Sequence, residues 1–277
     1  MFKELEPNHA KGRVKSNLDR RDLLKGAGGG VTLGMLASAF GALLAEGVDA
    51  SASAAGVDCM TILYPAGEGI TFHTDYYRDH HLVTIMNLYG KSISRFELRK
   101  VVPAAAGAPP VPYSAAVNIW IADLQAFNAD NVKYGRTLVE DVPHFTNSQP
   151  TIQYDKIHGQ MGSARNTPKI GDTCLTILYT NGDDVRWDVD YYRKNHMPLI
   201  MRLYGAKAIS RFELRKGDAG QAPGTKPTFI GTVNIYINEQ SAFDAAGKEH
   251  GPTLIKDVPH FSSVMPSAFP TIIYGIG

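Results

Sequence analysis

Two similar stretches decide the fold of this chain: Asp75-Tyr76-Tyr77-Arg78-Asp79-His80-His81-Leu82 and Asp190-Tyr191-Tyr192-Arg193-Lys194-Asn195-His196-Met197-Pro198-Leu199. Both are typical of the opening turns of a helix, because Asp75 and Asp190 can cap free amide groups and apolar residues then recur at helical spacing. In each stretch a tyrosine precedes a histidine by four residues, so both side chains project from one helical face. Each copy therefore presents one candidate titrating group.

The similarity extends well beyond these two stretches. Four further segments recur at an offset of 115 or 116 residues: Cys59–Tyr64 with Cys174–Tyr179, Ile93–Lys100 with Ile209–Lys216, Val117–Trp120 with Val233–Tyr236, and Asp141–Phe145 with Asp257–Phe261. A unit of about 100 residues is too long for a solenoid repeat and has the size of a small domain. The sequence therefore predicts a duplicated domain, with residues 55–158 as the first repeat, 159–172 as a linker and 173–277 as the second repeat.

Residues 1–54 are expected to be an export signal and not part of the fold. Asp19-Arg20-Arg21-Asp22-Leu23-Leu24-Lys25 precedes an apolar run rich in Gly and Ala (26–45), and small residues follow at 50–54. This pattern resembles a twin-arginine signal, which implies transport of the folded protein by the Tat machinery to the periplasm or beyond. The alternative is a membrane anchor, since the run nearly reaches the ~20 residues of a spanning helix. Its glycines and the small residues after it favour cleavage, and hence no stable membrane insertion.

Charge argues against two classes of partner for the mature chain. Removing residues 1–54 takes away seven of the 28 Lys and Arg and six of the 27 Asp and Glu, which leaves 21 of each. Such a balance provides no basic surface for a nucleic acid or an anionic membrane. We therefore expect a soluble cargo with no nucleic-acid partner.

Each repeat is predicted to run β-α-β-β-α-β. In the first repeat we expect strands at 60–64, 92–100, 113–121 and 150–155, helices beginning at Asp75 and about Asp123, and Gly90 at the end of the first helix. The second repeat follows the same order, with Gly205 closing its first helix and four extra residues, Ser267 to Pro270, near its last strand. Split βαβ units of this kind form a four-stranded antiparallel sheet with both helices on one face.

The other face of each sheet needs cover, because strands such as Val117–Ile121 carry apolar residues on both sides. Two sheets that face each other bury both of these surfaces. The predicted fold class is therefore α+β, with two ferredoxin-like βαββαβ repeats forming an intramolecular dimeric α+β barrel. The space between the sheets is the predicted pocket, and the pseudo-dimers could associate further into a homo-oligomer.

Two motifs carry a resemblance to a known family. Asp190-Tyr-Tyr-x-x-x-His-Met-Pro-Leu199, together with Val258-Pro-His-Phe261 before the last strand, resembles the EthD family of the dimeric α+β barrel superfamily. The first copy departs from the motif, with Leu82 and Val83 after its histidine. The resemblance implies the fold, whereas the superfamily contains cofactor-free monooxygenases, isomerases, cyclases, lyases and haem enzymes, so the site has to decide the chemistry.

His81 and His196 are the first candidates for catalysis. An imidazole titrates near neutrality, so it can take a proton from a substrate and return it without a cofactor. Tyr77 and Tyr192 could orient the imidazole or donate to a developing oxyanion. Local packing of both side-chain types is the alternative. Pro198 removes one helical hydrogen bond and frees the carbonyl of Lys194, so we expect it to open the helix beside His196.

Substrate-binding candidates lie on the later elements: His144, His260, Asn118, Asn234, Trp120 and Tyr236. The two histidines lie in loops fixed by proline and could supply a second acid or base, close the pocket mouth, or simply pack. The asparagines and aromatic residues share one strand face. If that face lines the barrel it offers an amide donor and an aromatic wall, and if it lies against the helices its role is structural.

The strand rows Arg95/Glu97/Arg99 and Arg211/Glu213/Arg215 are interpreted as solvated, self-paired charges, with a lumen row that binds a carboxylate or phenolate as the alternative. Cys59 and Cys174 open equivalent strands, where a small buried residue would serve equally well, and a disulfide between them depends on their distance. No metal site is predicted, because the adjacent His80 and His81 diverge by about 100 degrees on a helix.

The sequence thus predicts an exported enzyme that uses histidine acid–base chemistry on a small aromatic or oxygenated apolar compound, with no cofactor. Isomerisation, cyclisation, elimination and oxygenation of an activated aromatic all fit such a site. A non-catalytic periplasmic protein that binds a hydrophobic ligand is the alternative from another class. A haem-binding barrel protein is a third reading.

Overall fold

The computed structural model describes residues 58–103, 110–162, 167–222 and 224–277, so the predicted signal (1–54) lies outside the described residues. The predicted βαββαβ order occurs twice. The first repeat contains β1 (Asp58–Pro65), α3 (Thr74–Tyr76), a π-turn (Tyr77–His81), α4 (Leu82–Tyr89), β2 (Ile93–Val101), β3 (Tyr113–Ile121), α5 (Leu124–Asp141) and β4 (Thr151–Gly162). The second contains β5 (Thr173–Thr180), α6 (Val189–Tyr191), a π-turn (Tyr192–His196), α7 (Met197–Ala208), β6 (Ile209–Gly220), β7 (Phe229–Ile237), α8 (Gln240–Phe261) and β8 (Ser267–Ile276).

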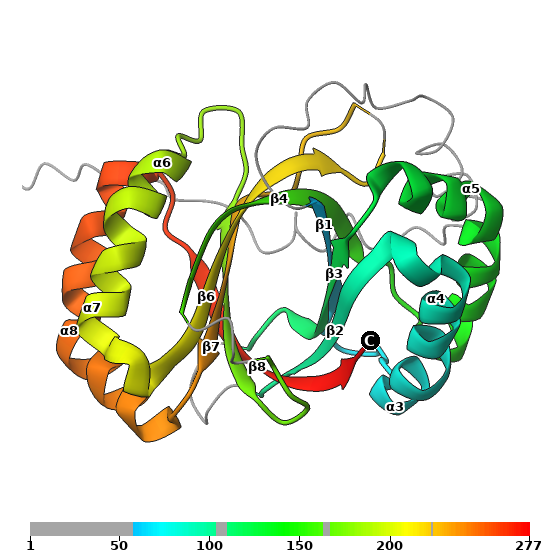
Figure 1. Cartoon of the computed structure of the whole chain (residues 1–277), viewed down its shortest axis with the longest axis horizontal. Coiled ribbons are helices and arrows are strands. Elements are labelled where there is room, and N and C mark those ends of the chain that lie inside the picture. Colours follow the sequence, from blue (N-terminus) through cyan, green and yellow to red (C-terminus); the bar gives the residue numbers. More distant parts are fainter. Residues whose placement is uncertain (1–57, 104–109, 163–166, 223) are drawn as a thin grey trace, which may run out of the picture.

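The strands form one closed barrel in the order β1-β3-β2-β8-β5-β7-β6-β4. Neighbouring strands are antiparallel throughout, and the two repeats are joined where β4 pairs with β6 and where β8 pairs with β2. Figure 1 shows the helices of the two repeats on opposite outer sides of this barrel. The predicted fold class, two ferredoxin-like repeats in an intramolecular α+β barrel, is confirmed.

Helix ends agree with the sequence at Gly90 and differ at Gly205 and at the caps. Gly90 (φ 49°) ends α4, as predicted, whereas Gly205 (φ 73°) makes a non-helical break inside α7, which continues to Ala208. The expected caps were wrong by two residues. Asp188 is the residue that caps the second repeat's first helix, accepting a hydrogen bond from the Tyr191 amide at 2.8 Å. The first repeat's helix follows His73 and has no side-chain cap.

Two boundary predictions near the last strands need correction. β4 continues to Gly162, where it pairs with Arg211 of β6, so it occupies the beginning of the predicted 159–172 linker. The four extra residues, Ser267 to Pro270, are not an insertion. Ser267 pairs with Leu178 as Thr151 pairs with Leu63, so the offset of 116 continues into β8.

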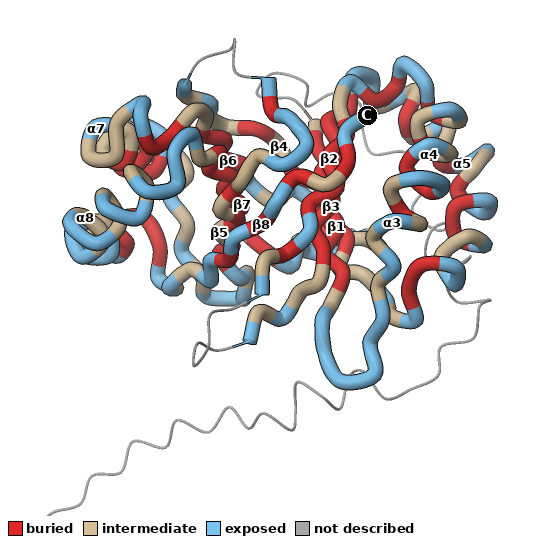
Figure 2. The backbone as a smooth tube through the Cα atoms, turned by 90° about the horizontal axis from the view of Figure 1, so that it is seen from below, coloured by how far each residue is buried: buried red, intermediate tan, exposed pale blue. Residues whose placement is uncertain are grey.

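Apolar side chains fill the layer between each helix pair and the barrel wall, and Figure 2 shows the strands as the most continuously buried part of the chain. The first layer is centred on residues such as Tyr77, Phe96 and Phe145, and the second on their equivalents Tyr192, Phe212 and Phe261. Each layer buries the apolar face of its helices, which is what holds short helices in place. The two layers therefore form two separate cores on either side of the barrel.

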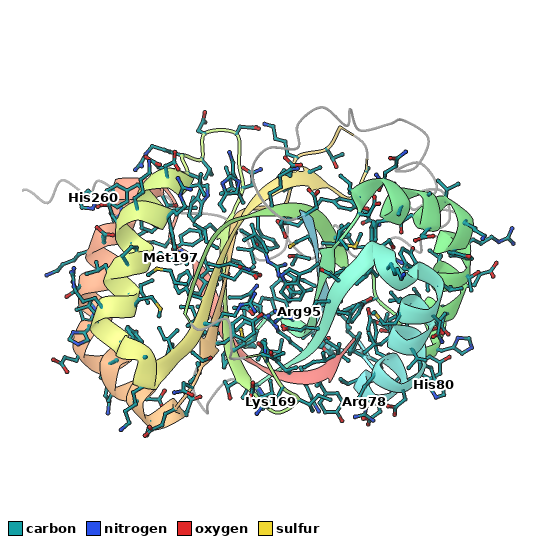
Figure 3. The ribbon with its side chains drawn as sticks, in the orientation of Figure 1. Arg78, His80, Arg95, Lys169, Met197 and His260 are labelled. Carbon is teal, nitrogen blue, oxygen red and sulfur yellow. The ribbon has the colours of Figure 1, made fainter. Side chains whose placement is uncertain are left out.

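The barrel interior contains buried charges. Arg99 and Arg215 are fully buried and pair with Glu97 and Glu213 of their own strands. Arg95, labelled within the ring of strands in Figure 3, keeps 18% of its side chain exposed and stacks on Trp120 at 4.1 Å. The interpretation of these rows as solvated strands was therefore wrong for the four inner residues. These side chains lie in the space between the sheets, where the pocket was predicted.

The two inner arginines connect the repeats. Arg99 donates hydrogen bonds to Asn234 Oδ1 (2.6 Å) and to the Tyr236 hydroxyl (2.7 Å) of the second repeat. Arg215 donates to Asn118 Oδ1 (2.9 Å) of the first repeat and stacks on Trp120 at 4.6 Å. A charge that leaves water needs such partners, because an unpaired buried charge is strongly destabilising. The lumen is thus a polar core shared by the two repeats.

Candidate active site

A π-turn places the tyrosine and histidine of each motif. The amide of Leu82 donates to the Tyr77 carbonyl, five residues earlier, and the amide of Met197 does the same to Tyr192. Such one-turn widenings are rare and occur frequently at functional sites. The first repeat forms the same turn with Val83 where the second has Pro198, so the turn does not depend on proline. The expectation that Pro198 opens the helix therefore does not explain the wide turn.

The widened turn directs both side chains inward. Tyr77 and Tyr192 are fully buried, and His81 and His196 are only 5% and 4% exposed. Each histidine ring packs against its tyrosine, with ring centres 4.8 Å apart in both repeats. The shared face predicted from the spacing of four residues is therefore present.

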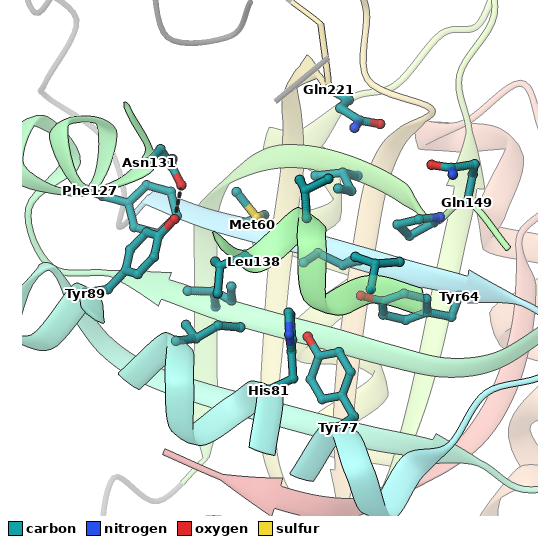
Figure 4. Close-up of a pocket in the computed structure, with 17 residues that line it drawn as sticks. Met60, Tyr64, Tyr77, His81, Tyr89, Phe127, Asn131, Leu138, Gln149 and Gln221 are labelled. Atoms are coloured by element: carbon teal, nitrogen blue, oxygen red, sulfur yellow. Dashed lines mark hydrogen bonds between the residues drawn. The ribbon is translucent and has the colours of Figure 1, made fainter. Parts of the chain in front are cut away.

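An aspartate at the end of each second helix holds the histidine. His81 Nδ1 lies 2.7 Å from Asp141 Oδ2, and His196 Nδ1 lies 2.7 Å from Asp257 Oδ2. The carboxylate accepts a hydrogen bond from the Nδ1–H group. This favours the tautomer in which Nε2 carries no proton and is free to accept one. In Figure 4 the His81 ring points toward the cavity beside the Tyr77 hydroxyl.

These aspartates were not among the predicted site residues. Asp141 lies 60 residues after His81, and helical spacing cannot detect a partner at that separation. A signal was nevertheless present, since both aspartates open the identical Asp-Val-Pro-His-Phe segments. Recurrence of an acid beside a recurring histidine could have identified the pair.

The outer side of Asp141 faces solvent. Its Oδ1 accepts a hydrogen bond from the Tyr76 hydroxyl at 2.8 Å. The side chain of His144 is 63% exposed, stacks on Tyr76 with ring centres 5.5 Å apart, and places Nδ1 3.2 Å from the same carboxylate. The second repeat repeats this arrangement with Asp257, Tyr191 and His260. His144 and His260 thus contact their aspartates from outside, on the side away from His81 and His196. They were predicted to lie in loops, but His144 ends the 3-10 turn Val142–His144 and His260 lies in the last turn of α8.

Burial and the aspartate act in opposite directions on the pKa of His81. Burial lowers the pKa of His81, and the hydrogen bond and negative charge of Asp141 offset this only in part, so the pKa lies below 6.5. Burial raises the pKa of Asp141, but the hydrogen bonds from His81 and Tyr76 outweigh it and the pKa is lowered. At neutral pH the pair is therefore a neutral imidazole held by a carboxylate, which is the form of a general base.

A mostly apolar cavity lies between the helices of the first repeat and its sheet (Figure 4). About 60 Å³ of it is open to the centres of water molecules. His81 and Tyr77 line it together with Tyr64, Tyr89, Asn131, Gln149, Gln221 and aliphatic residues that include Met60, Ile62, Ile85, Ile119, Leu138 and Ile152. Gln221 belongs to the second repeat, so both repeats contribute to this cavity.

The Tyr77 hydroxyl is the unusual polar group of the cavity. It is buried beside the Tyr64 hydroxyl and makes no well-formed hydrogen bond with the described residues, and the same is true of the equivalent Tyr192 hydroxyl beside Tyr179. Burial, with the neighbouring Tyr64 hydroxyl, raises the pKa of Tyr77 well above 10, so the group keeps its proton. A buried hydroxyl without a partner is rare enough to require an explanation. A ligand oxygen that accepts its hydrogen bond would provide one.

The predicted site residues therefore fall in three places. His81 and Tyr77 line the cavity, and His196 and Tyr192 occupy the equivalent position in the second repeat. His144 and His260 lie on the surface beside the aspartates. Asn118, Asn234, Trp120 and Tyr236 line the barrel interior, where their polar groups bind the inner charged residues, including a bond of 3.1 Å from Trp120 Nε1 to Glu213. Their face therefore lines the barrel, the arrangement in which an amide donor was expected, and Asn234 Nδ2 is buried there without a hydrogen-bond partner among the described residues.

Three negative findings concern the described residues alone. No group of three or more His, Cys, Asp or Glu side chains is placed to hold a metal ion. Cys59 and Cys174 are buried and are not joined in a disulfide. No helix in the described ranges has the length and apolar character needed to cross a membrane.

Solved structures share this fold. An EthD-like protein from Ralstonia eutropha JMP134 is 25% identical over 37% of this chain and 91% of its own, with a TM-score of 0.35. A proposed monooxygenase from Fusobacterium nucleatum is 6% identical, covers 81% of this chain and 94% of its own, and gives a TM-score of 0.50. An anthrone oxidase-like protein covers the same shares at 6% identity with a TM-score of 0.47. No family model and no curated protein matches the chain. The similarity to the Fusobacterium nucleatum protein concerns the fold alone, which is the α+β barrel described above.

Proposed function

We propose that the first repeat is an enzyme active site in which His81 transfers a proton to and from a small apolar substrate. One observation carries the proposal: a buried imidazole, fixed through Nδ1 by Asp141, faces an apolar cavity that also holds the unpartnered Tyr77 hydroxyl. A held tautomer, a free basic nitrogen and a nearby donor are what acid–base catalysis requires.

The roles follow from the protonation states. Neutral His81 accepts a proton at Nε2 from an acidic C–H or O–H of the substrate, and Asp141 stabilises the imidazolium that forms. The Tyr77 hydroxyl donates to the oxygen on which negative charge develops. Return of the proton to another atom completes an isomerisation, a cyclisation or, with departure of a leaving group, an elimination. Oxygenation of the activated carbanion would require dioxygen as the oxidant.

The first repeat is preferred although the second has the fuller motif. The cavity that His81 lines is formed by residues of the first repeat together with Gln221. Gly247 of α8 stands where α5 has Asn131, so the second repeat lacks an amide at the equivalent position.

The haem alternative fits this site poorly. The cavity lies among buried side chains in the layer between helices and sheet, and Nδ1 of His81 is already held by Asp141. A visible absorption spectrum of the mature protein from its native compartment, followed by mass spectrometry of released compounds, is the first measurement. A colourless protein that releases an oxygenated apolar metabolite supports the proposal, and a Soret or flavin band overturns it.

Turnover by paired variants is the decisive test. Phenols and enolisable ketones, including any released metabolite, are incubated with the mature protein and followed by mass spectrometry. We expect His81→Ala to lower the rate by about 10²-fold or more, whereas His196→Ala, its matched control, should change the rate little. Tight binding without turnover, unchanged in both variants, would identify a ligand-binding protein instead.

Export is a separate proposal that rests on residues 1–54 of the sequence. A fusion of this segment to a reporter that is active only after folded export tests it directly. We expect export that depends on the Tat machinery and is abolished when Arg20 and Arg21 are both replaced by lysine. Retention of the uncleaved chain in the membrane would support the anchor alternative.

A further inference from the structure

A second polar pair lies at the end of the first-repeat cavity away from His81. Tyr89, the last residue of α4, donates a hydrogen bond to Asn131 Oδ1 of α5 at 2.5 Å (Figure 4). The two residues are only 4% and 3% exposed, and both line the cavity. Polar groups buried to this degree stand out in a wall that is otherwise aliphatic.

The bond leaves both N–H donors of the Asn131 amide unused. An asparagine amide has an acceptor oxygen and two N–H donors. Tyr89 occupies the oxygen, and in the described part of the chain no group accepts a hydrogen bond from Asn131 Nδ2. Burial raises the pKa of Tyr89, so its hydroxyl stays protonated and keeps the amide in this orientation. The free N–H groups are therefore available to an acceptor within the cavity.

The second repeat shows that the fold does not need this pair. Tyr204 is the equivalent of Tyr89, and Gly247 is the equivalent of Asn131. The same two helices pack there without an amide, and Tyr204 still contacts Phe243 with ring centres 5.0 Å apart, as Tyr89 contacts Phe127 at 5.2 Å. Burying an amide costs free energy unless its hydrogen bonds are satisfied. Its presence in the repeat with the open cavity points to binding.

The cavity thus has a polar group at each of two ends. At one end are His81 Nε2 and the unpartnered Tyr77 hydroxyl, and at the other is Asn131, with aliphatic side chains such as Ile62 and Ile119 between them. A purely apolar ligand would leave the hydroxyl and the amide without partners. A ligand with an oxygen at each end would satisfy both.

We propose that Asn131, oriented by Tyr89, binds a carbonyl or hydroxyl oxygen of the substrate on the side opposite to the atom that His81 deprotonates. This rests on the proposed function and assigns its substrate class: a small apolar molecule with two oxygen functions on opposite sides. A compound of that class would accept a hydrogen bond from Asn131 and place its second oxygen beside Tyr77 and His81.

The test compares two probes of nearly the same shape. 4-Hydroxyacetophenone has oxygens at opposite ends of a ring, and 4-ethylphenol lacks the carbonyl oxygen. Their affinities for the full-length mature protein are measured by calorimetry or NMR titration. We expect the first to bind more tightly, and Asn131→Leu, which has a similar shape without the amide, to reduce this preference by about 3- to 10-fold, the value of one neutral hydrogen bond.

Two further variants separate binding from folding. Tyr89→Phe removes only the hydroxyl that orients the amide, and it should reduce the preference in the same direction. Tyr204→Phe, its matched control in the second repeat, should leave the preference unchanged. An unaltered preference in both Asn131→Leu and Tyr89→Phe, or no binding of either probe to the wild type, would overturn the assignment.

Failure of this inference differs from failure of the proposed function. Turnover that is lost in His81→Ala but unaffected in Asn131→Leu contradicts only the assignment of Asn131. A preference that depends on Asn131, in a protein that turns over no substrate of this class, supports the assignment and contradicts the acid–base proposal.

Discussion

At the scale of single residues, the protonation of His81 is controlled by its surroundings and not by its ordinary titration. Burial among Tyr77 and Phe145 lowers its pKa, and Asp141 limits the decrease. Because the imidazole is already neutral at pH 7, a higher pH should not increase the fraction of active base. The exposed His144 contacts the same carboxylate from the opposite side and so links Asp141 to the protein surface.

The pH dependence of turnover should show this environment. The rate requires neutral His81, so it should rise as pH increases through a pKa below 6.5 and be level at pH 7. In Asp141→Asn the carboxylate no longer raises the pKa of His81, so the rising limb should move to lower pH and the plateau should fall by about 10²-fold. Rates measured between pH 4 and 8 check this. An unmoved limb in Asp141→Asn, or an equal loss in Asp257→Asn, would contradict it.

Part of this site was predictable from short-range spacing. The interval of four residues predicted that Tyr77 and His81 share a face, and the structure agrees, although a π-turn and not a regular helix arranges them. Spacing in the sequence could not identify Asp141, because Asp141 meets His81 only through the tertiary contact between α5 and the π-turn. The sequence also could not decide whether Asn118 faces the lumen, because strand alternation defines two faces without saying which one is inside.

At the scale of elements, the two repeats pack aromatic rings of different size over the tyrosine of their first strand. Trp187 stacks over Tyr179 with ring centres 4.4 Å apart, and Phe72 takes the same place over Tyr64 at 4.6 Å. The strand residue beneath the larger ring is Gly231, whereas beneath the smaller ring it is Ala115. A Cβ on Gly231 would lie 2.3 Å from the Trp187 ring. The glycine is therefore matched to the tryptophan.

This match predicts a compensating pair of mutations. Gly231→Ala should lower the free energy of unfolding by about 1–3 kcal/mol, because a well-packed core cannot absorb the added methyl group. Trp187→Phe combined with Gly231→Ala recreates the first repeat's combination and should recover most of that loss. Urea unfolding of the single and double variants measures the coupling. Additive effects of the two substitutions would show that the contact does not limit the glycine position.

Strand register shows where local sequence similarity misleads. Pro150-Thr151-Ile152 and Pro270-Thr271-Ile272 look equivalent, which suggested four extra residues before the second. The barrel instead pairs Thr151 with Leu63 and Ser267 with Leu178, so the true counterpart of Pro150 is Pro266. Register follows which residues fill the inner face, and Gln153 and Phe269 both point there. A three-residue match carries no such information.

At the scale of the whole molecule, the shared lumen makes stability depend on pH. Burial raises the pKa of Asp155 to about 6, although Arg215 and the hydrogen bonds from Thr61 and Gln153 oppose the rise. A carboxyl whose folded pKa is raised stabilises the protein fully below its unfolded pKa, about 3.9, and loses this contribution as pH rises through 6. Ionised Asp155 therefore opposes folding at neutral pH.

Asp155→Asn should remove this effect, because the amide resembles the protonated carboxyl. We expect the free energy of unfolding to increase by about 1–3 kcal/mol at pH 8 and to be nearly unchanged at pH 4. Denaturant unfolding at the two pH values measures the difference. A variant that is equally altered at both pH values would show that shape, and not ionisation, matters at this position.

The barrel also predicts that the two repeats unfold together. Trp120 lies in the lumen and Trp187 in the second helix layer, and these are the only tryptophans of the chain. Trp187→Phe and Trp120→Tyr, each taken from the opposite repeat, leave one fluorescent reporter apiece. We expect both reporters to give the same urea midpoint, because β4 and β8 each bridge the repeats.

Arg99→Met tests whether the lumen carries this coupling. The substitution removes the fully buried partner of Glu97, which keeps its ion pair with Arg95, and it also removes the bonds to Asn234 and Tyr236 of the other repeat. We expect a loss of about 3–5 kcal/mol, the usual effect of breaking a buried ion pair. Because those bonds cross the barrel, the midpoint should fall by the same amount for Trp120 and for Trp187. A shift confined to one reporter would mean that each repeat is held by its own helix layer, and that the charged lumen does not join them.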